Sequence, residues 1–118
     1  MRAVRFHEHG GPEVLQVDEV DNPEPDHGEG VVDIEAAGVN PVDTYFREGA
    51  YPVPHLPFIG GGDLAGVVAA VGEGVDDFLV GDRVLGTGLG NGRPGTYAEA
   101  AAAPADTGGS FDPAPAVV

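Results

Sequence analysis

The sequence contains no cysteine, no tryptophan and no lysine. Without cysteine, the 118-residue chain can form no disulfide, use no thiol nucleophile and offer no thiolate to zinc. It has no run of about 18 apolar residues, so no transmembrane helix is expected. The first ten residues are polar and charged and lack the apolar segment of a signal peptide, which favours the cytoplasm.

Positive charge is scarce. Five arginines stand against 20 acidic residues, which gives a net charge of −15. Such a chain cannot neutralise phosphates, so nucleic-acid binding is excluded, and anionic membranes would repel it. Disorder is a poor fit, because 42% of the residues are hydrophobic and they cluster in strand-like runs.

We interpret the acidic excess as an adaptation to concentrated salt, as in halophilic microbes. In about 1 M salt the Debye length falls to roughly 3 Å, so self-repulsion becomes tolerable. The alternative is an acidic protein that binds a basic partner.

Glycine and proline, 20 and 11 residues, are spread through the chain and favour short strands separated by turns. Alternation predicts that Val32, Ile34 and Ala36 face inward from one strand. The chain is predicted to be a mostly β domain, a partly open barrel with one or two short helices. Expected strands cover residues 2–6, 14–20, 31–39, 64–71 and 83–86, with a strand or short helix at 96–103.

One or two helical turns are predicted within residues 40–48. Asn40 is a favourable N-cap, Pro41 suits the first helical position, and Gly49 can end the helix. Residues 50–62 hold several prolines and predict an irregular loop, and the sequence from residue 104 onward shows little pattern.

Two motifs suggest ligand binding and are rejected. Residues 60–65 (GGGDLA) match a dinucleotide-binding motif by letter, but they lead into a predicted strand rather than a helix. His7 and His9 could share a strand face, but two histidines without a third ligand make a weak metal site. We therefore expect two surface histidines and no metal.

The segment 40–51 gathers polar and aromatic side chains beside the predicted helix start: Asn40, Asp43, Tyr45, Arg47 and Tyr51. An amide and two phenols can donate hydrogen bonds to a carbonyl oxygen without a metal. Taken alone, these residues favour a simpler interpretation, in which Tyr45 packs in the core and Asn40 only caps the helix.

Seven segments, taken in order, resemble the quinone oxidoreductase (zeta-crystallin-like) branch of the medium-chain dehydrogenase/reductase superfamily. They are residues 1–4 (MRAV), 9–15 (HGGPEVL), 37–45 (AGVNPVDTY), 62–68 (GDLAGVV), 71–75 (VGEGV), 78–84 (FLVGDRV) and 95–99 (GTYAE). The resemblance implies a GroES-like, substrate-side domain over residues 1–106, followed by a connecting tail at 107–118.

Members of this branch pass a hydride from NADPH to a quinone or enone, without a metal. In zinc-dependent relatives a cysteine stands at the position of Asn40 and a histidine at that of Gly62. By this resemblance Asn40, Tyr45 and Tyr51 line the cleft for substrate and nicotinamide, and Asp63 lies at its floor. Their work would be orientation and polarisation of the carbonyl group.

The sequence also departs from the family. Residues 60–63 (GGGD) stand where a Pro-Gly-Ser-Asp pattern is usual, and the 118 residues contain no dinucleotide fingerprint. We expect the chain alone to bind NADPH poorly and to be inactive without a Rossmann domain. The candidate partners are that Rossmann domain or further copies of the same chain. The rival hypotheses are a stand-alone GroES-like module for binding or assembly and, third, a metal-binding acidic protein.

Overall fold

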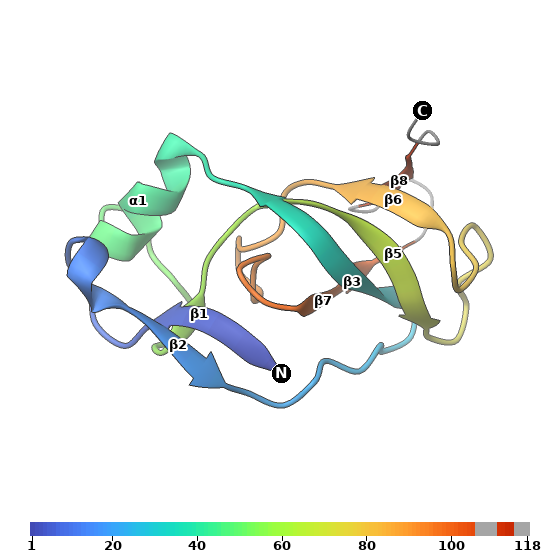
Figure 1. The fold of residues 1–118 in the computed structure, drawn as a ribbon, viewed down its shortest axis with the longest axis horizontal. Coiled ribbons are helices and arrows are strands. Elements are labelled where there is room, and N and C mark those ends of the chain that lie inside the picture. Colours follow the sequence, from blue (N-terminus) through green and yellow to red (C-terminus); the bar gives the residue numbers. More distant parts are fainter. Residues whose placement is uncertain (106–110, 115–118) are drawn as a thin grey trace.

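The computed structural model describes residues 1–105 and 111–114. Two antiparallel sheets form its body, with strand orders β2-β1-β4 and β7-β3-β5-β6-β8 (Figure 1). This arrangement confirms the mostly β, partly open GroES-like fold. The elements in chain order are β1 (Arg2–Phe6), the 3-10 helix η1 (Pro12–Val14), β2 (Leu15–Glu19), β3 (Glu29–Gly38), α1 (Pro41–Glu48), β4 (Phe58–Ile59), β5 (Asp63–Val71), β6 (Arg83–Gly86), β7 (Ala100–Pro104) and β8 (Phe111–Pro113).

In the smaller sheet, the first two predicted strands form a hairpin. Strands β1 and β2 pair antiparallel, from Arg2 opposite Glu19 to Phe6 opposite Leu15. The short strand β4 joins the other edge of β1, so that Phe58 lies opposite Phe6. The expectation of an irregular loop over 50–62 was wrong for these two residues, because their strand pairing depends on a distant partner.

Strand β3 begins and ends close to its predicted bounds, but its facing was partly wrong. Val31 and Val32 are both buried, whereas Ala36 is exposed. The pairing with β5 shifts register between Val31 and Val32 and again between Ile34 and Ala36. Each irregularity places consecutive residues out of strict alternation, so a period of two cannot hold along the whole strand.

Most residues of the main hydrophobic core belong to strands of the larger sheet. In strand β5, Leu64, Gly66 and Val68 are buried, and the residues between them are half-buried. Of the region 96–103, expected as a strand or short helix, only residues 100–103 belong to a strand, β7. Phe111 of β8 adds a buried ring that the sequence pattern did not predict. The buried cluster consists of Val32, Leu64, Val68, Phe78, Val84, Leu89, Ala101, Ala103, Ala105 and Phe111.

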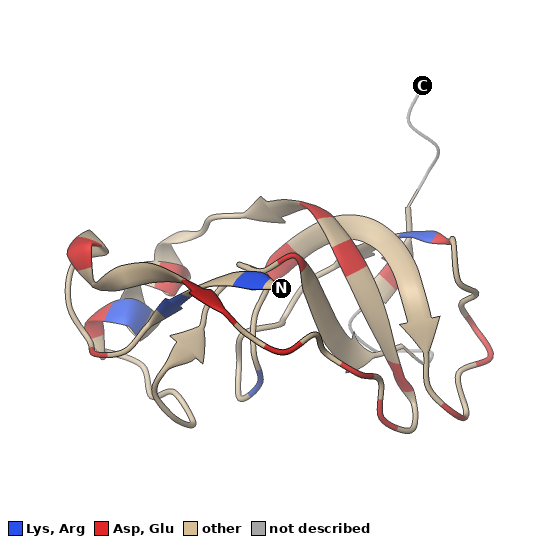
Figure 2. Ribbon diagram, turned by 60° about the horizontal axis from the view of Figure 1, so that its bottom comes forward, with Lys and Arg blue, Asp and Glu red and all other residues tan. Residues whose placement is uncertain are grey.

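Acidic residues are distributed over strands and connecting segments alike (Figure 2). Within the described ranges, no helix is long and apolar enough to cross a membrane. The predicted boundary at residue 106 and most of the connecting tail at 107–118 lie outside the described residues.

Candidate functional site

Helix α1 begins and ends as its sequence predicts. Asn40 is extended at the N-cap with φ −121° and ψ 156°, and Gly49 ends the helix with φ 91°. The carboxylate of Asp43 accepts a hydrogen bond from the backbone N–H of Asn40 at 2.8 Å. This contact closes the first turn around Asn40 and fixes the direction from which its side chain leaves the backbone.

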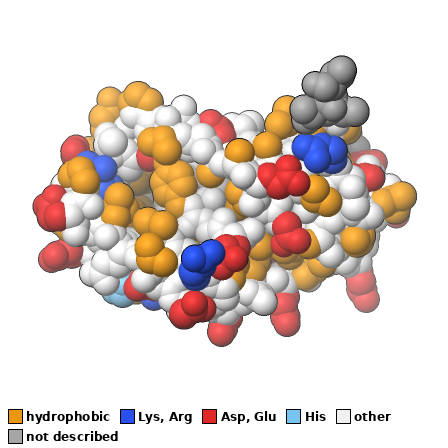
Figure 3. Space-filling model, in the orientation of Figure 1, with side chains coloured by type: hydrophobic (Ala, Val, Ile, Leu, Met, Phe, Trp, Pro, Cys, Tyr) orange, Lys and Arg blue, Asp and Glu red, His pale blue; other side chains and the backbone are white. Residues whose placement is uncertain are grey.

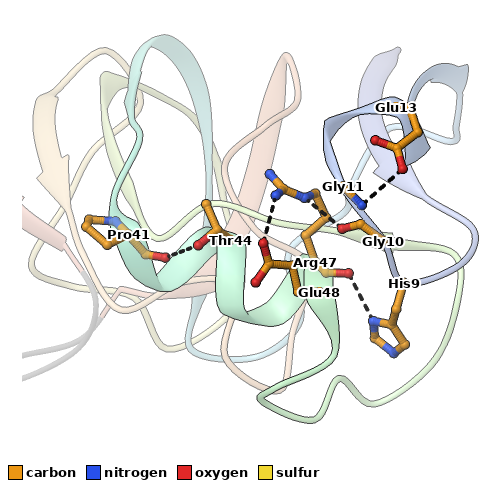
Figure 4. Close-up of polar contacts among 8 residues, drawn as sticks. All are labelled: His9, Gly10, Gly11, Glu13, Pro41, Thr44, Arg47 and Glu48. Carbon is orange, nitrogen blue, oxygen red and sulfur yellow. Dashed lines mark hydrogen bonds and ion pairs between the residues drawn. The ribbon is translucent and has the colours of Figure 1, made fainter.

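The last turn of α1 rests on the turn between β1 and η1 (Figure 4). The ring of His9 contacts the carbonyl oxygen of Arg47 through Nδ1 at 3.2 Å, and the side chain of Arg47 reaches Gly10. Both ends of the helix are therefore attached to other parts of the domain.

A cleft of about 520 Å³ opens beside α1. Its lining comes from α1 and the segment after it, from the start of β5, and from the glycine-rich loop that follows β6. The lining residues are Asn40, Val42, Asp43, Phe46, Tyr51, Pro52, Gly62, Asp63, Thr87, Gly88, Leu89, Gly90 and Asn91.

Asp63 is the centre of the polar contacts in this cleft. Its Oδ2 accepts a hydrogen bond from the side-chain Nδ2 of Asn40 at 2.7 Å. Its Oδ1 accepts one from the hydroxyl of Thr87 at 2.8 Å. Because an amide nitrogen carries two hydrogens, Asn40 keeps a second N–H for another acceptor. Asn40 is thus both the N-cap residue and a side chain of the cleft.

The two predicted tyrosines lie differently. Tyr51 lines the cleft, whereas Tyr45 does not and packs edge-on against Tyr51 with ring centroids 5.6 Å apart. Tyr45 is 42% exposed, so the alternative that placed it in the core was wrong. Phe46 also lines the cleft and packs against Tyr51 at 5.6 Å.

Sequence reasoning missed Phe46 and Thr87 as cleft residues. The helical spacing of Phe46 relative to Val42 was a usable signal, because residues four apart share one helix face. Nothing in the loop at 86–92 distinguishes Thr87 from its neighbours, since its contact to Asp63 joins residues far apart in sequence.

His7 and His9, which were weighed and rejected as a metal site, have separate partners. His7 contacts Asp18 through Nε2 at 2.6 Å, whereas His9 contacts the backbone of α1. Among the described residues, no three histidine or acidic side chains are grouped so that they could hold a metal ion. Residues 60–62 lead into β5 rather than a helix, in agreement with the rejection of a phosphate-binding loop.

A second cleft, of about 510 Å³, lies between the two sheets and includes Arg5 and Arg93 in its lining. Both guanidinium groups are already paired, Arg5 with Asp18 at 2.8 Å and Arg93 with Glu29 at 3.1 Å. A ligand anion would have to displace a carboxylate from either arginine. The cleft beside α1 offers an unused donor at Asn40 and is therefore the stronger candidate site.

The lining of the α1 cleft fits some groups and not others. It combines aromatic rings, an amide and a hydroxyl, which suit a flat, uncharged ring with carbonyl groups. Its charged residues, within the described part of the chain, are Asp43 and Asp63. Their carboxylates would repel the phosphates of a dinucleotide, and the described part of the lining lacks the histidine and cysteine ligands that are typical of zinc sites. The nicotinamide end of NADPH fits this lining, and its phosphates do not.

Apolar side chains gather on the same end of the molecule. On the face shown in Figure 3, a group of hydrophobic side chains covers the half that contains α1, and acidic side chains stand around the rim. Val39, Val42, Tyr45 and Tyr51, on and around α1, are all exposed. The cleft therefore opens on a comparatively apolar surface.

Comparison with known proteins gives a consistent picture. The family model for the alcohol dehydrogenase GroES-like domain matches residues 26–110. The quinone oxidoreductase of Lama guanicoe is 48% identical over 103 residues, which cover 86% of this chain and 31% of that protein. The crystal structure of Escherichia coli quinone oxidoreductase complexed with NADPH has a TM-score of 0.89 at 38% identity and covers 98% of this chain and 33% of that chain.

Metal-binding proteins share the fold. A cobalt- and zinc-bound thermostable alcohol dehydrogenase from Pyrobaculum aerophilum has a TM-score of 0.90 at 30% identity, over 99% of this chain and 42% of that chain. The fold alone therefore does not decide whether a metal takes part. The chain spans 25–32% of the length of the curated relatives it matches.

Proposed function

The chain belongs to the alcohol dehydrogenase GroES-like domain family, and on that premise we propose that it is the substrate-side domain of a zinc-independent, NADPH-dependent quinone oxidoreductase. The substrate would be a quinone or an enone held in the cleft beside α1. The proposal is supported by the curated quinone oxidoreductases that the chain resembles. The observation that carries it is the amide of Asn40, which Asp63 orients at the cleft and which keeps a free N–H.

The proposed role of Asn40 is to polarise the substrate carbonyl. With one N–H committed to Asp63, the second can donate to a carbonyl oxygen that gains negative charge during reduction. Asp63 stays committed to Asn40 and Thr87, so it acts by orientation and not as a proton carrier. When bound, NADPH supplies the hydride.

The aromatic residues of the cleft would position the substrate ring. Phe46 and Tyr51 provide apolar surface, and Tyr45 packs edge-on against Tyr51. The loop 88–92 adds Gly88 and Gly90, which have no side chains, together with Leu89 and Asn91. A planar ring can then pack closely, which restricts its orientation relative to Asn40.

The proposal makes two statements about cofactors. The cleft presents an amide at position 40 and a glycine at position 62, where zinc-dependent relatives carry a cysteine and a histidine, so carbonyl polarisation falls to hydrogen bonds. The cleft also lacks cations for the NADPH phosphates within the described residues. We therefore propose that the phosphates are bound by a further domain or a partner chain, and that this chain alone binds NADPH weakly and does not turn over.

Binding of a quinone to the chain tests the site directly. Menadione is titrated into the isotope-labelled chain in molar KCl and followed by ¹H–¹⁵N NMR. Without cysteine or lysine, the chain offers no side-chain thiol or amine that could form adducts with the quinone. Shifts are expected at the Asn40 side-chain amide and in loop 88–92. Asn40→Ala should weaken binding about fivefold, the equivalent of one hydrogen bond.

Asn22→Ala, in an exposed segment away from the cleft, is the matched control and should leave the affinity unchanged. Absence of menadione binding, or equal affinity in the Asn40→Ala variant, would contradict the proposed site.

Turnover is tested in a chimera in which this chain replaces the matching third of the Escherichia coli enzyme. Oxidation of NADPH by menadione is expected in the chimera and should fall strongly with Asn40→Ala. A chimera that folds and binds NADPH but does not oxidise it would overturn the enzymatic proposal. Ring or oligomer formation by the chain in light scattering, with no quinone binding, would favour the alternative of a stand-alone binding or assembly module.

A further inference from the structure

Tyr97 does not line the cleft, but its hydroxyl contacts residues that precede and follow Asn40 in the chain. It donates to Oδ2 of Asp43, in the first turn of α1, at 2.7 Å. It also lies 3.4 Å from the carbonyl oxygen of Gly38, the last residue of β3. A single half-buried phenol therefore joins the strand before Asn40 to the helix after it.

The position of Tyr97 is fixed independently of α1. Its carbonyl oxygen accepts from Val4 of β1 at 2.7 Å, and its N–H donates to the carbonyl oxygen of Gly60 at 3.1 Å. Its ring packs over Gly60 and Gly61, and an added Cβ at Gly61 would press against the ring carbons. The segment 60–65, which matches a dinucleotide-binding motif by letter, thus packs against this aromatic ring through its first two glycines.

The contact with Asp43 continues to the cleft. The same Oδ2 of Asp43 that accepts from Tyr97 also accepts from the backbone N–H of Asn40 at 2.8 Å. The side-chain amide of Asn40 in turn donates to Asp63. A series of contacts therefore runs from the phenol of Tyr97 through Asp43 to the backbone of Asn40, and from the side chain of Asn40 to Asp63 at the cleft.

We propose that Tyr97 is a positioning residue for the cleft: by holding Asp43, it fixes the N-cap and thereby the direction in which the Asn40 amide faces the substrate. This inference rests on the proposed function only for the identity of the substrate. The hydrogen-bond series itself is a property of the chain and can be tested without a ligand.

The electrostatic environment keeps Tyr97 a hydrogen-bond donor. Burial, the hydrogen bond to Asp43, and the charges of Asp43 and Asp63 raise the pKa of Tyr97 well above its ordinary value. Tyr97 therefore remains a donor to Asp43 through the neutral range.

The first test compares the full chain with its Tyr97→Phe variant, which keeps the ring against Gly60 and Gly61 and removes the hydroxyl. The two protons on Nδ2 of Asn40 are resolved by ¹H–¹⁵N NMR. Loss of the hydroxyl should bring their chemical shifts closer together, as in an amide without a fixed partner, and weaken menadione binding about fivefold. Asp43→Asn, which keeps an oxygen acceptor but removes its charge, should act in the same direction.

Thr44→Val is the matched control, because it removes another hydroxyl of α1, one that donates to the carbonyl oxygen of Pro41 at 2.7 Å (Figure 4). It should leave the Asn40 protons and the menadione affinity unchanged. If Thr44→Val moves them as much as Tyr97→Phe does, the effect is general to α1 and the proposal fails.

A double-mutant cycle separates positioning through Asp43 from simple loss of packing. In an Asp43→Ala background, Tyr97→Phe should cause no further change in the Asn40 protons, whereas independent effects would add. Additive effects, or unchanged Asn40 protons in Tyr97→Phe, overturn the inference. Absence of menadione binding to the unaltered chain would instead contradict the proposed function, and the Asn40 protons would still decide the role of Tyr97.

Discussion

Arg47 and Gly10 are joined by two hydrogen bonds, one donated by each residue. Arg47 donates through Nε to the carbonyl oxygen of Gly10 at 3.1 Å, and the N–H of Gly10 donates to the carbonyl oxygen of Arg47 at 3.1 Å. The Arg47 side chain is only 14% exposed. In a chain with five basic residues, one guanidinium is thus used to attach the end of α1 to the turn after β1.

Replacing Arg47 with methionine tests this attachment. The substitution keeps an apolar stem of similar length and removes the donor to Gly10, leaving a half-buried carbonyl oxygen without that partner. We expect a loss of about 1.5–3 kcal/mol in the free energy of unfolding, the usual contribution of a hydrogen bond from a charged group. Urea unfolding followed by circular dichroism in molar KCl provides the measurement.

The control for Arg47→Met is Arg83→Met, which makes the same change in net charge. Arg83 is 44% exposed and pairs with the exposed Glu35 at 3.4 Å, a contact of little energetic value. Its loss should cost less than about 0.5 kcal/mol. Equal effects of the two substitutions would show that Arg47 contributes through charge alone.

A methyl group on Gly66 should disrupt the centre of the larger sheet. Gly66 lies on β5 between Ile34 of β3 and Val84 of β6, and a Cβ there would overlap the carbonyl oxygen of Asp33. Gly66→Ala should therefore cost about 3 kcal/mol or more in the free energy of unfolding, or prevent folding.

Gly88→Ala is the control for Gly66→Ala. Gly88 has φ 77° and open space around it, so alanine there brings backbone strain alone, about 1 kcal/mol. Thermal unfolding of the two variants, measured side by side, gives the comparison. A Gly66→Ala variant as stable as Gly88→Ala would contradict the close approach of β3 and β5.

The sequence predicted those elements whose signals are local. The hairpin of β1 and β2 and the strand β6 follow from alternation and turn residues, and α1 follows from Asn40, Pro41 and Gly49. Strands β4 and β8 were missed because two or three residues carry no periodicity, and only pairing with a distant strand defines them. The register shifts in β3 likewise depend on its partner β5.

The residues of the candidate site also fall into those that the sequence predicted and those that it missed. Asn40 and Tyr51 were named because they stand near each other in sequence, and Asp63 because of the family resemblance. Thr87 and Tyr97 were missed, since each contacts its acidic partner across more than 20 residues of chain, Thr87 at Asp63 and Tyr97 at Asp43. A hydrogen-bond network that joins separate loops leaves no pattern within any one of them.

Asp18 should make stability depend on pH in the acid range. Hydrogen bonds from His7 and then from Arg5 hold the pKa of Asp18 below its ordinary value of about 3.8. A carboxyl with a lowered pKa stabilises the fold above its ordinary pKa, and this contribution disappears as the pH falls through the folded-state pKa. The stability difference between the unaltered chain and Asp18→Asn should therefore shrink below about pH 4.

Thermal unfolding in molar KCl from pH 7 to pH 3 measures that difference. Asp76→Asn, in an exposed turn, is the matched control and should change the midpoint at pH 7 less than Asp18→Asn does. If the midpoint difference between the unaltered chain and Asp18→Asn is the same at pH 7 and pH 3, Asp18 does not contribute to acid sensitivity.

The net charge of −15 predicts that salt stabilises the fold. Acidic residues cover both ends and the rim of the molecule, so their mutual repulsion should weaken as the Debye length shrinks from about 10 Å at 0.1 M to about 3 Å at 1 M. We expect the unfolding midpoint to rise by about 5 °C or more between 0.1 M and 2 M KCl, roughly 1 kcal/mol for a domain of this size.

Screening can be separated from the general effect of salt on apolar burial by removing charge. A variant that carries Glu8→Gln, Glu24→Gln and Asp76→Asn loses three exposed carboxylates and should show a smaller rise in its midpoint over the same KCl range. If both proteins gain stability equally, the salt acts on hydrophobic burial, as excluded salts do for most proteins, and charge repulsion is not the cause. A midpoint that salt leaves unchanged would contradict the interpretation of the acidic surface as an adaptation to concentrated salt.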